Sequence, residues 1–250
     1  MKKKKYFMVL AFSLLAIILF NSQRVSAQEA SINISLGDSP KEYVGSLKLM
    51  MVLTMLTLLP SFLIMMSCFT RIAVVLSFFK SAIGAQQAIP SQVLVGLALF
   101  TTIFVMAPVV TDINENALKP YMNNEITQEV AIEKGTAPIR SFMLKETRKK
   151  DLELFVDMSK MDKTNLTREN VPLTVVVPAF IISELKTAFE IGFLIYLPFL
   201  VIDMVVASVL MSMGMMMLPP VMISLPFKLL LFVMVDGWHL LIKSLVLSFI

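Results

Sequence analysis

Long apolar stretches separated by short polar connections dominate the chain. Gly45–Thr70 carries a single charge at Lys48, and Val93–Val110 is uncharged over eighteen residues. As helices, runs of about twenty apolar residues are long enough to cross the roughly 30 Å hydrocarbon core of a bilayer. Pro60 lies inside the first run and predicts a kink there. We therefore expect a first apolar helical hairpin over residues 45–110.

The connection inside this hairpin is polar and basic. Arg71 and Lys80 follow the first apolar run, and a polar turn, Gly84–Gln87, precedes Pro90. Lysine and arginine in short connections favour the cytoplasmic side of a membrane. The pattern predicts that this connection lies on that side.

The middle of the chain is rich in charged residues, unlike the apolar stretches before it. Residues 111–170 carry ten basic and eleven acidic side chains. Asn124 is placed to cap a short helix over Glu125–Lys134, which we expect to end at Gly135. A second charged helix is expected over about Leu144–Met161, where apolar residues recur every three positions. This region is predicted to be a small water-facing helical segment, on the periplasmic side by alternation of the membrane crossings.

Residues 171–250 are apolar again, but prolines and charges interrupt them. Pro178 and Pro198 are expected to punctuate the helices. The charges singled out here as buried or in contact with other subunits are Glu184, Lys186, Glu190, Asp203, Lys228 and Asp236. A charge at the centre of a bilayer costs roughly 2.5–3.5 kcal/mol on insertion scales, unless it is buried in protein or lines a water-filled cavity. We expect a second apolar hairpin that is stable only with partners.

A methionine-rich connection divides this second hairpin. Five of the seven residues 211–217 are methionines, namely Met211, Met213, Met215, Met216 and Met217. Gly214 weakens a helix and Pro219–Pro220 cannot continue one, so the connection is expected to bend. Thioether side chains are flexible and polarizable. They could simply fill apolar gaps, or they could line a surface that repacks around changing neighbours.

The charged residues of the second hairpin allow structural and functional interpretations. Lys186 and Glu190 are four residues apart and can pair on one helix, either locally or between subunits. Asp203 is the best candidate for an intramembrane carboxylate, as a structural contact or as part of a proton relay. Lys228 is expected to extend its amine toward the surface.

The first 27 residues have the pattern of a secretory signal peptide. Four lysines precede the apolar core Tyr6–Phe20, and small residues precede a cleavage site between Ala27 and Gln28. The alternative is an uncleaved first membrane helix. Cleavage would leave residues 28–44 as a polar arm on the periplasmic side.

Composition narrows the class of protein. Hydrophobic residues make up 57% and charged residues 16% of the 250, whereas soluble domains carry about 25% charged residues. We predict an all-α membrane protein made of kinked helical hairpins. A single cysteine and a single histidine exclude an internal disulfide, HExxH and a multi-histidine cluster. Without the leader the chain is near neutral. This near-neutral charge predicts no nucleic-acid partner. The absence of these motifs predicts no cofactor, no metal and no catalysis.

Two longer motifs resemble a known family. PAFIISELKTAFEIGF at Pro178–Phe193 and PFKLLLFVMVDGW at Pro226–Trp238 are similar to the two signature patterns of the FliP family of flagellar export proteins. That family is shared with the injectisome proteins called SctR. The resemblance extends from about Leu47 to Ser248 and includes FFKSAIGAQQAIP. Each signature exceeds a dozen positions, which makes a chance match negligible.

This resemblance implies a function. FliP-like subunits form part of the type III export gate, a helical complex with FliQ, FliR and further copies of themselves, near FlhB and FlhA. The implied location is the bacterial inner membrane, multi-pass in the flagellar basal body, with the complex projecting to the periplasmic side. The implied cargo is unfolded flagellar proteins. The resemblance also implies that the methionines of residues 211–217 form a gasket in the pore. An ion- or proton-coupled transporter using Asp203 with Glu184 and Glu190 stays the alternative.

Overall fold

The computed structural model describes residues 40–85, 89–159, 171–215 and 218–249. None of these residues forms a strand, so the all-α prediction is confirmed. The expected leader, its cleavage site at Ala27 and Gln28, and Met216 and Met217 lie outside the described residues. The elements are α2 (Pro40–Met65), α3 (Phe69–Ile83), α4 (Ser91–Ile113), the π-helix η1 (Asn114–Leu118), α5 (Lys119–Met122), α6 (Gln128–Glu146), α7 (Lys149–Met158), α8 (Leu173–Ser212), α9 (Pro220–Met234) and α10 (Gly237–Leu247).

Contacts divide the chain into two units, residues 1–56 and 57–250. In the first unit the structure describes the beginning of α2, whose side chains from Leu47 onward are exposed. The description below concerns the second unit.

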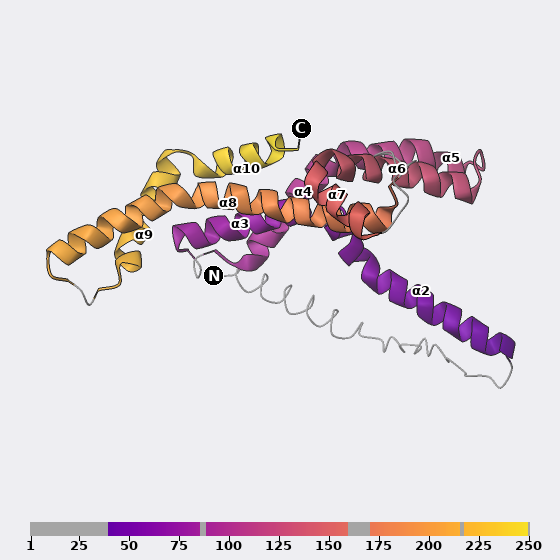
Figure 1. Cartoon of the computed structure of the whole chain (residues 1–250), viewed down its shortest axis with the longest axis horizontal. Coiled ribbons are helices and arrows are strands. Elements are labelled where there is room, and N and C mark those ends of the chain that lie inside the picture. Colours follow the sequence, from indigo (N-terminus) through magenta and orange to yellow (C-terminus); the bar gives the residue numbers. More distant parts are fainter. Residues whose placement is uncertain (1–39, 86–88, 160–170, 216–217, 250) are drawn as a thin grey trace, which may run out of the picture. The chain divides into compact units, whose positions relative to one another are not determined.

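Helix α8 is the element against which the others pack. It is 40 residues long, which corresponds to about 60 Å at 1.5 Å per residue. It continues through Pro178 and Pro198, so the expectation that these prolines interrupt the helix is wrong. Helices α3, α6, α7 and α9 all contact α8, and Figure 1 shows its long ribbon running past them.

Two apolar cores lie along α8. One joins α6 and α7 to the beginning of α8, around Met143 and Phe180. The other joins α3, α4, α9 and α10 to later turns of α8, around Phe79 and Phe199. Helix α3 comes especially close at Gly192, where a Cβ would lie 2.7 Å from the Phe78 ring. Glycine at this position lets the two backbones approach.

The first apolar run folds differently from the prediction. Helix α2 continues through Pro60 and ends at Met65, and a new helix, α3, begins at Phe69. The prediction of an uninterrupted segment over Gly45–Thr70 is therefore wrong at its C-terminal end. Arg71 and Lys80 belong to α3 and not to a short polar connection, and Arg71 is buried.

The charged middle region also differs in its boundaries. Helix α6 runs through Gly135 and Pro138 to Glu146, so the expected stop at Gly135 is wrong. A Cβ at Gly135 would lie 3.6 Å from Ala117, which places α6 close against η1. Asn124 has φ +58 and precedes the helix; Thr127 is the N-cap instead. The second helix, α7, is present but shorter than predicted.

Among the residues that the structure describes, two stretches are long and apolar enough to cross a membrane, Ser91–Met122 and Leu173–Ser212. Helices α9 and α10 satisfy the same test only as a pair, and they are bent by 66° at their junction. Asp236 adopts the left-handed conformation there, with φ +50. Trp238 follows at once and packs edge-on against Phe79 and Phe232.

Candidate functional site

The methionine turn, residues 211–215 as the structure describes it, ends α8. Gly214 has φ +76, and its N–H donates to the carbonyl of Met211 at 3.0 Å. The N–H of Met215 donates to the carbonyl of Leu210, also at 3.0 Å. These two bonds form the Schellman motif, in which a left-handed glycine satisfies the last carbonyls of a helix. The sequence MSMGM thus fixes a sharp, hydrogen-bonded end to α8.

The methionine side chains of this turn point away from the chain's own core. Met211, Met213 and Met215 are 62%, 63% and 44% exposed. The structure leaves open where Met216 and Met217 lie, because they are outside the described residues. Helix α9 then starts at Pro220, where the first-turn position tolerates a residue without an N–H.

An apolar groove of about 450 Å³ runs below this turn, between α8 and α9. No polar surface lines it. Its walls are aliphatic and aromatic: Val201, Ile202, Val205, Val206, Val209, Leu210, Ile223 and Phe227. The turn and the groove together form one continuous apolar end to the α8–α9 hairpin.

A partly buried ion pair joins α9 to α8. The Lys228 amine lies 2.6 Å from Oδ2 of Asp203 and donates to the carbonyl of Ala82 at 3.0 Å. The Ser224 hydroxyl donates to the other oxygen of Asp203. The Lys228 side chain is 3% exposed, so the expectation that it extends toward the surface is wrong. Because Ala82 lies in the last turn of α3, this amine also satisfies a carbonyl at a helix C-terminus.

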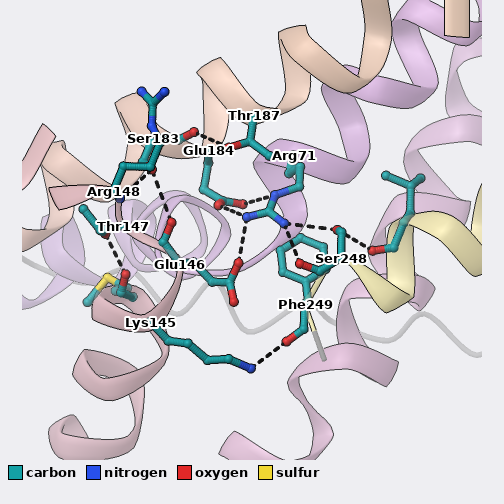
Figure 2. Close-up of polar contacts among 12 residues, drawn as sticks. Arg71, Lys145, Glu146, Thr147, Arg148, Ser183, Glu184, Thr187, Ser248 and Phe249 are labelled. Atoms are coloured by element: carbon teal, nitrogen blue, oxygen red, sulfur yellow. Dashed lines mark hydrogen bonds and ion pairs between the residues drawn. The ribbon is translucent and has the colours of Figure 1, made fainter. Parts of the chain in front are cut away.

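Arg71 is the centre of a second polar cluster (Figure 2), which we call the arginine hub. Its guanidinium donates from Nε to Oε2 of Glu184 at 3.0 Å and from Nη2 to both Glu184 and Glu146. Nη1 donates to the carbonyl and the hydroxyl of Ser248, both at 3.1 Å. The ring of Phe249 lies 3.9 Å from the guanidinium carbon. Arginine suits this position because its planar fork presents five donors at once.

The hub joins four helices that are far apart in the sequence. Arg71 comes from α3, Glu146 ends α6, Glu184 belongs to α8, and Ser248 follows α10 (Figure 2). Next to it, the Ser183 hydroxyl accepts the N–H of Arg148 at 3.0 Å and lies 3.2 Å from the carbonyl of Glu146. The turn between α6 and α7 is thus held against α8.

The remaining charges of the two signature motifs lie on the surface of this chain. The Lys186 amine is 3.7 Å from Glu190, on an exposed side of α8. Asp236 is exposed at the α9–α10 bend, and so is His239 one turn later. Among the described residues no group of three His, Cys, Asp or Glu side chains could hold a metal ion.

Arg71, Glu146 and Ser248 are functional candidates that sequence reasoning missed. Arg71 carries the only signal, because it is a lone charge followed at once by the apolar residues Ile72–Leu76. Its partners lie 75 to 177 residues away, and no local pattern connects them.

The comparisons with known proteins all match the chain to the same family. The FliP family model matches residues 52–245. The flagellar biosynthetic protein FliP of Bacillus subtilis (strain 168) is 57% identical over 218 residues, 87% of this chain and 98% of that protein. The FliP protein of Aquifex aeolicus (strain VF5) is 47% identical over 236 residues, 94% of this chain and 98% of that protein. That of Pectobacterium carotovorum subsp. carotovorum is 50% identical over 233 residues, 93% and 90% of the two chains.

Proposed function

Because the chain belongs to the FliP family, we propose that it is a pore-forming core subunit of the flagellar type III export gate. At the coarser level it is a non-enzymatic protein of flagellar biosynthesis with membrane-capable helices. The proposed assembly contains further copies of this chain with FliQ and FliR, and is adjacent to FlhB and FlhA. It lies in the inner membrane, projects to the periplasmic side and passes unfolded flagellar proteins.

One observation carries this proposal: the apolar end of the α8–α9 hairpin is uncovered in the single chain. The methionine turn is exposed, and large apolar side chains such as Val201, Val205 and Phe227 are exposed around the groove below it. Large exposed apolar patches mark membrane or protein contacts. At about 60 Å, α8 is also twice as long as the roughly 30 Å hydrocarbon core, so lipid alone cannot cover it unless it tilts strongly.

A ring of such turns could close a passage wide enough for an extended polypeptide. Thioether side chains can deform around a substrate and meet one another when it has gone. An apolar constriction also excludes ions by losing its water. Neither property requires a titratable group. The buried carboxylate of Glu184 and the partly buried carboxylate of Asp203 have basic partners in Arg71 and Lys228, which favours a scaffold over an ion-coupled transporter.

The test is ion conductance of the complex assembled with FliQ and FliR in lipid vesicles. Replacing Met215, Met216 and Met217 with alanine should raise the closed-state conductance about tenfold or more, because a widened constriction holds water. The matched control replaces Met204, Met222 and Met234, which are 61%, 68% and 77% exposed but lie outside the turn. An unchanged closed-state conductance after replacement of Met215, Met216 and Met217 would contradict the gasket role.

A further inference from the structure

The methionine turn has a chemical property beyond its softness, because thioethers are oxidised readily where an oxidant can reach them. Susceptibility to oxidation follows exposure. Met211, Met213 and Met215 are all exposed, whereas Met143 is fully buried and Met106 nearly so. The turn therefore concentrates three accessible thioethers within five residues.

Along the described chain next to the turn, few side chains can donate a hydrogen bond to a sulfoxide oxygen. Between Val205 and Met215 the only side-chain hydrogen-bond donors in the sequence are two serines. The Ser208 hydroxyl donates to the carbonyl of Met204 at 2.9 Å, and that of Ser212 to the carbonyl of Val209 at 2.7 Å. The groove next to the turn is wholly apolar. A polar oxygen added here must be hydrated by water, since burying it unpaired is unfavourable.

We propose that Met211, Met213 and Met215 form an oxidation site that regulates the closed passage. Peroxide converts their thioethers to sulfoxides, water enters the constriction, and ions leak until the sulfoxides are reduced. This inference rests on the proposed function, because it requires that the turn faces the passage. It goes further by naming a small-molecule oxidant as the agent that opens the passage without any substrate.

The chemical step is balanced. A lone pair of the methionine sulfur attacks one peroxide oxygen, the S–O bond forms and the O–O bond breaks. The hydroxide that leaves takes the proton from the attacked oxygen and departs as water. Sulfur loses two electrons and hydrogen peroxide gains them. Methionine sulfoxide reductases return the thioether at the expense of thiols, so the modification is reversible.

The experiment uses the complex assembled with FliQ and FliR in lipid vesicles. Ion conductance is measured before and after hydrogen peroxide, and again after a methionine sulfoxide reductase with its thiol reductant. Peptide mass spectrometry reports sulfoxide at each methionine. Two variants are compared with the natural chain. The turn variant carries Met211→Leu, Met213→Leu and Met215→Leu, together with Met216→Leu and Met217→Leu, because the proposed gasket includes them. The other variant carries Met204→Leu, Met222→Leu and Met234→Leu, outside the turn. Leucine keeps the volume of methionine and lacks the sulfur.

Peroxide should raise conductance at least about fivefold in the natural chain and in the variant outside the turn, because the constriction becomes wetted. The ratio should stay near one in the turn variant, and the reductase should restore the natural chain. Three results would each overturn the inference: sulfoxide at all three positions without a rise, a rise that persists in the turn variant, or no sulfoxide in the turn. If turn-to-alanine variants leak but oxidised complexes do not, the inference fails while the gasket role stands.

Discussion

Both halves of α8 are largely apolar, but the chain buries them to different extents. The first half, to about Ile195, buries Val176, Phe180 and Glu184 against α3, α6 and α7. In the second half, only Phe199 and Leu210 are buried. Hydrophobicity alone therefore does not say which part of a long apolar helix the chain itself covers. The chain's own folding buries more of the first half than of the second.

The ion pairs of the two halves differ in exposure in the same way. The arginine hub in the first half is enclosed, with Arg71 3% and Glu184 0% exposed. The Lys228–Asp203 pair in the second half is half-open, because Asp203 is 27% exposed. Breaking a buried pair is costly when it leaves an uncompensated charge behind. Substitutions placed along α8, from residue 184 toward 214, should therefore have progressively smaller effects on the stability of the single chain.

The largest effect is expected from Arg71→Ala. This change leaves Glu184 and Glu146 beside each other without their cation, and should lower the free energy of unfolding by about 3–5 kcal/mol. Arg71→Lys should recover only part of the loss, because an amine cannot reproduce the planar fork. Thermal or denaturant unfolding of the purified chain in detergent would measure both.

The control for this prediction is an ion pair on the surface. Lys149 lies 3.9 Å from Glu153, and both side chains are largely exposed. Lys149→Ala should change stability by less than about 1 kcal/mol, since exposed pairs contribute little. Equal losses for Arg71→Ala and Lys149→Ala would contradict the expected difference between a buried and an exposed ion pair.

An intermediate and asymmetric effect is expected at the second pair. Asp203→Asn leaves the buried Lys228 amine without a counter-charge and should cost about 1–3 kcal/mol, less than the hub because Asp203 is partly exposed. Lys228→Met should cost less, because water can reach the carboxylate that stays behind. Combining Lys228→Met with Asp203→Leu should recover stability, as buried pairs often can be replaced by apolar residues. The measurement is the free energy of unfolding of all three variants. A larger loss for Lys228→Met than for Asp203→Asn would contradict this prediction.

The smallest effect is expected at Gly214, in the methionine turn. Gly214 has φ +76 and open space where a Cβ would lie, so Gly214→Ala meets a conformational penalty of about 1 kcal/mol and no clash. Gly96, inside α4, has equally open space and ordinary helical backbone. There, the same substitution should leave stability unchanged or raise it by up to about 1 kcal/mol. Opposite signs for the two variants would confirm that the turn geometry, and not the space around it, requires glycine.

Sequence reasoning predicted the elements better than their ends. The apolar runs, the helical class and the bend at Gly214 and Pro219–Pro220 follow from local patterns. The expected kink at Pro60, inside α2, stays a prediction. Pro178 and Pro198 were a poor guide, because α8 continues through both. These residues break an isolated helix, but packing along a long helix can stabilise it through a proline.

The site was predicted in part for the same reason. The methionines stand out because five of them fall within seven residues, and Lys186–Glu190 because residues four apart lie on one face of a helix. The arginine hub could not be predicted, since Arg71 meets Glu184 only when α3 and α8 pack side by side. Whether any of these charges contacts another subunit stays a prediction.

The distance along the chain between Arg71 and Ser248 has a consequence for biosynthesis. These two residues are 177 positions apart, and a ribosome adding roughly 5–20 residues per second needs roughly 10–35 s to cover that interval. Glu146 and Glu184 follow Arg71 by 75 and 113 residues, so the carboxylates are synthesised before the carbonyl and hydroxyl that accept from Nη1. A product that stops before Ser248 therefore lacks both acceptors of Nη1, and its buried guanidinium is left partly unsatisfied.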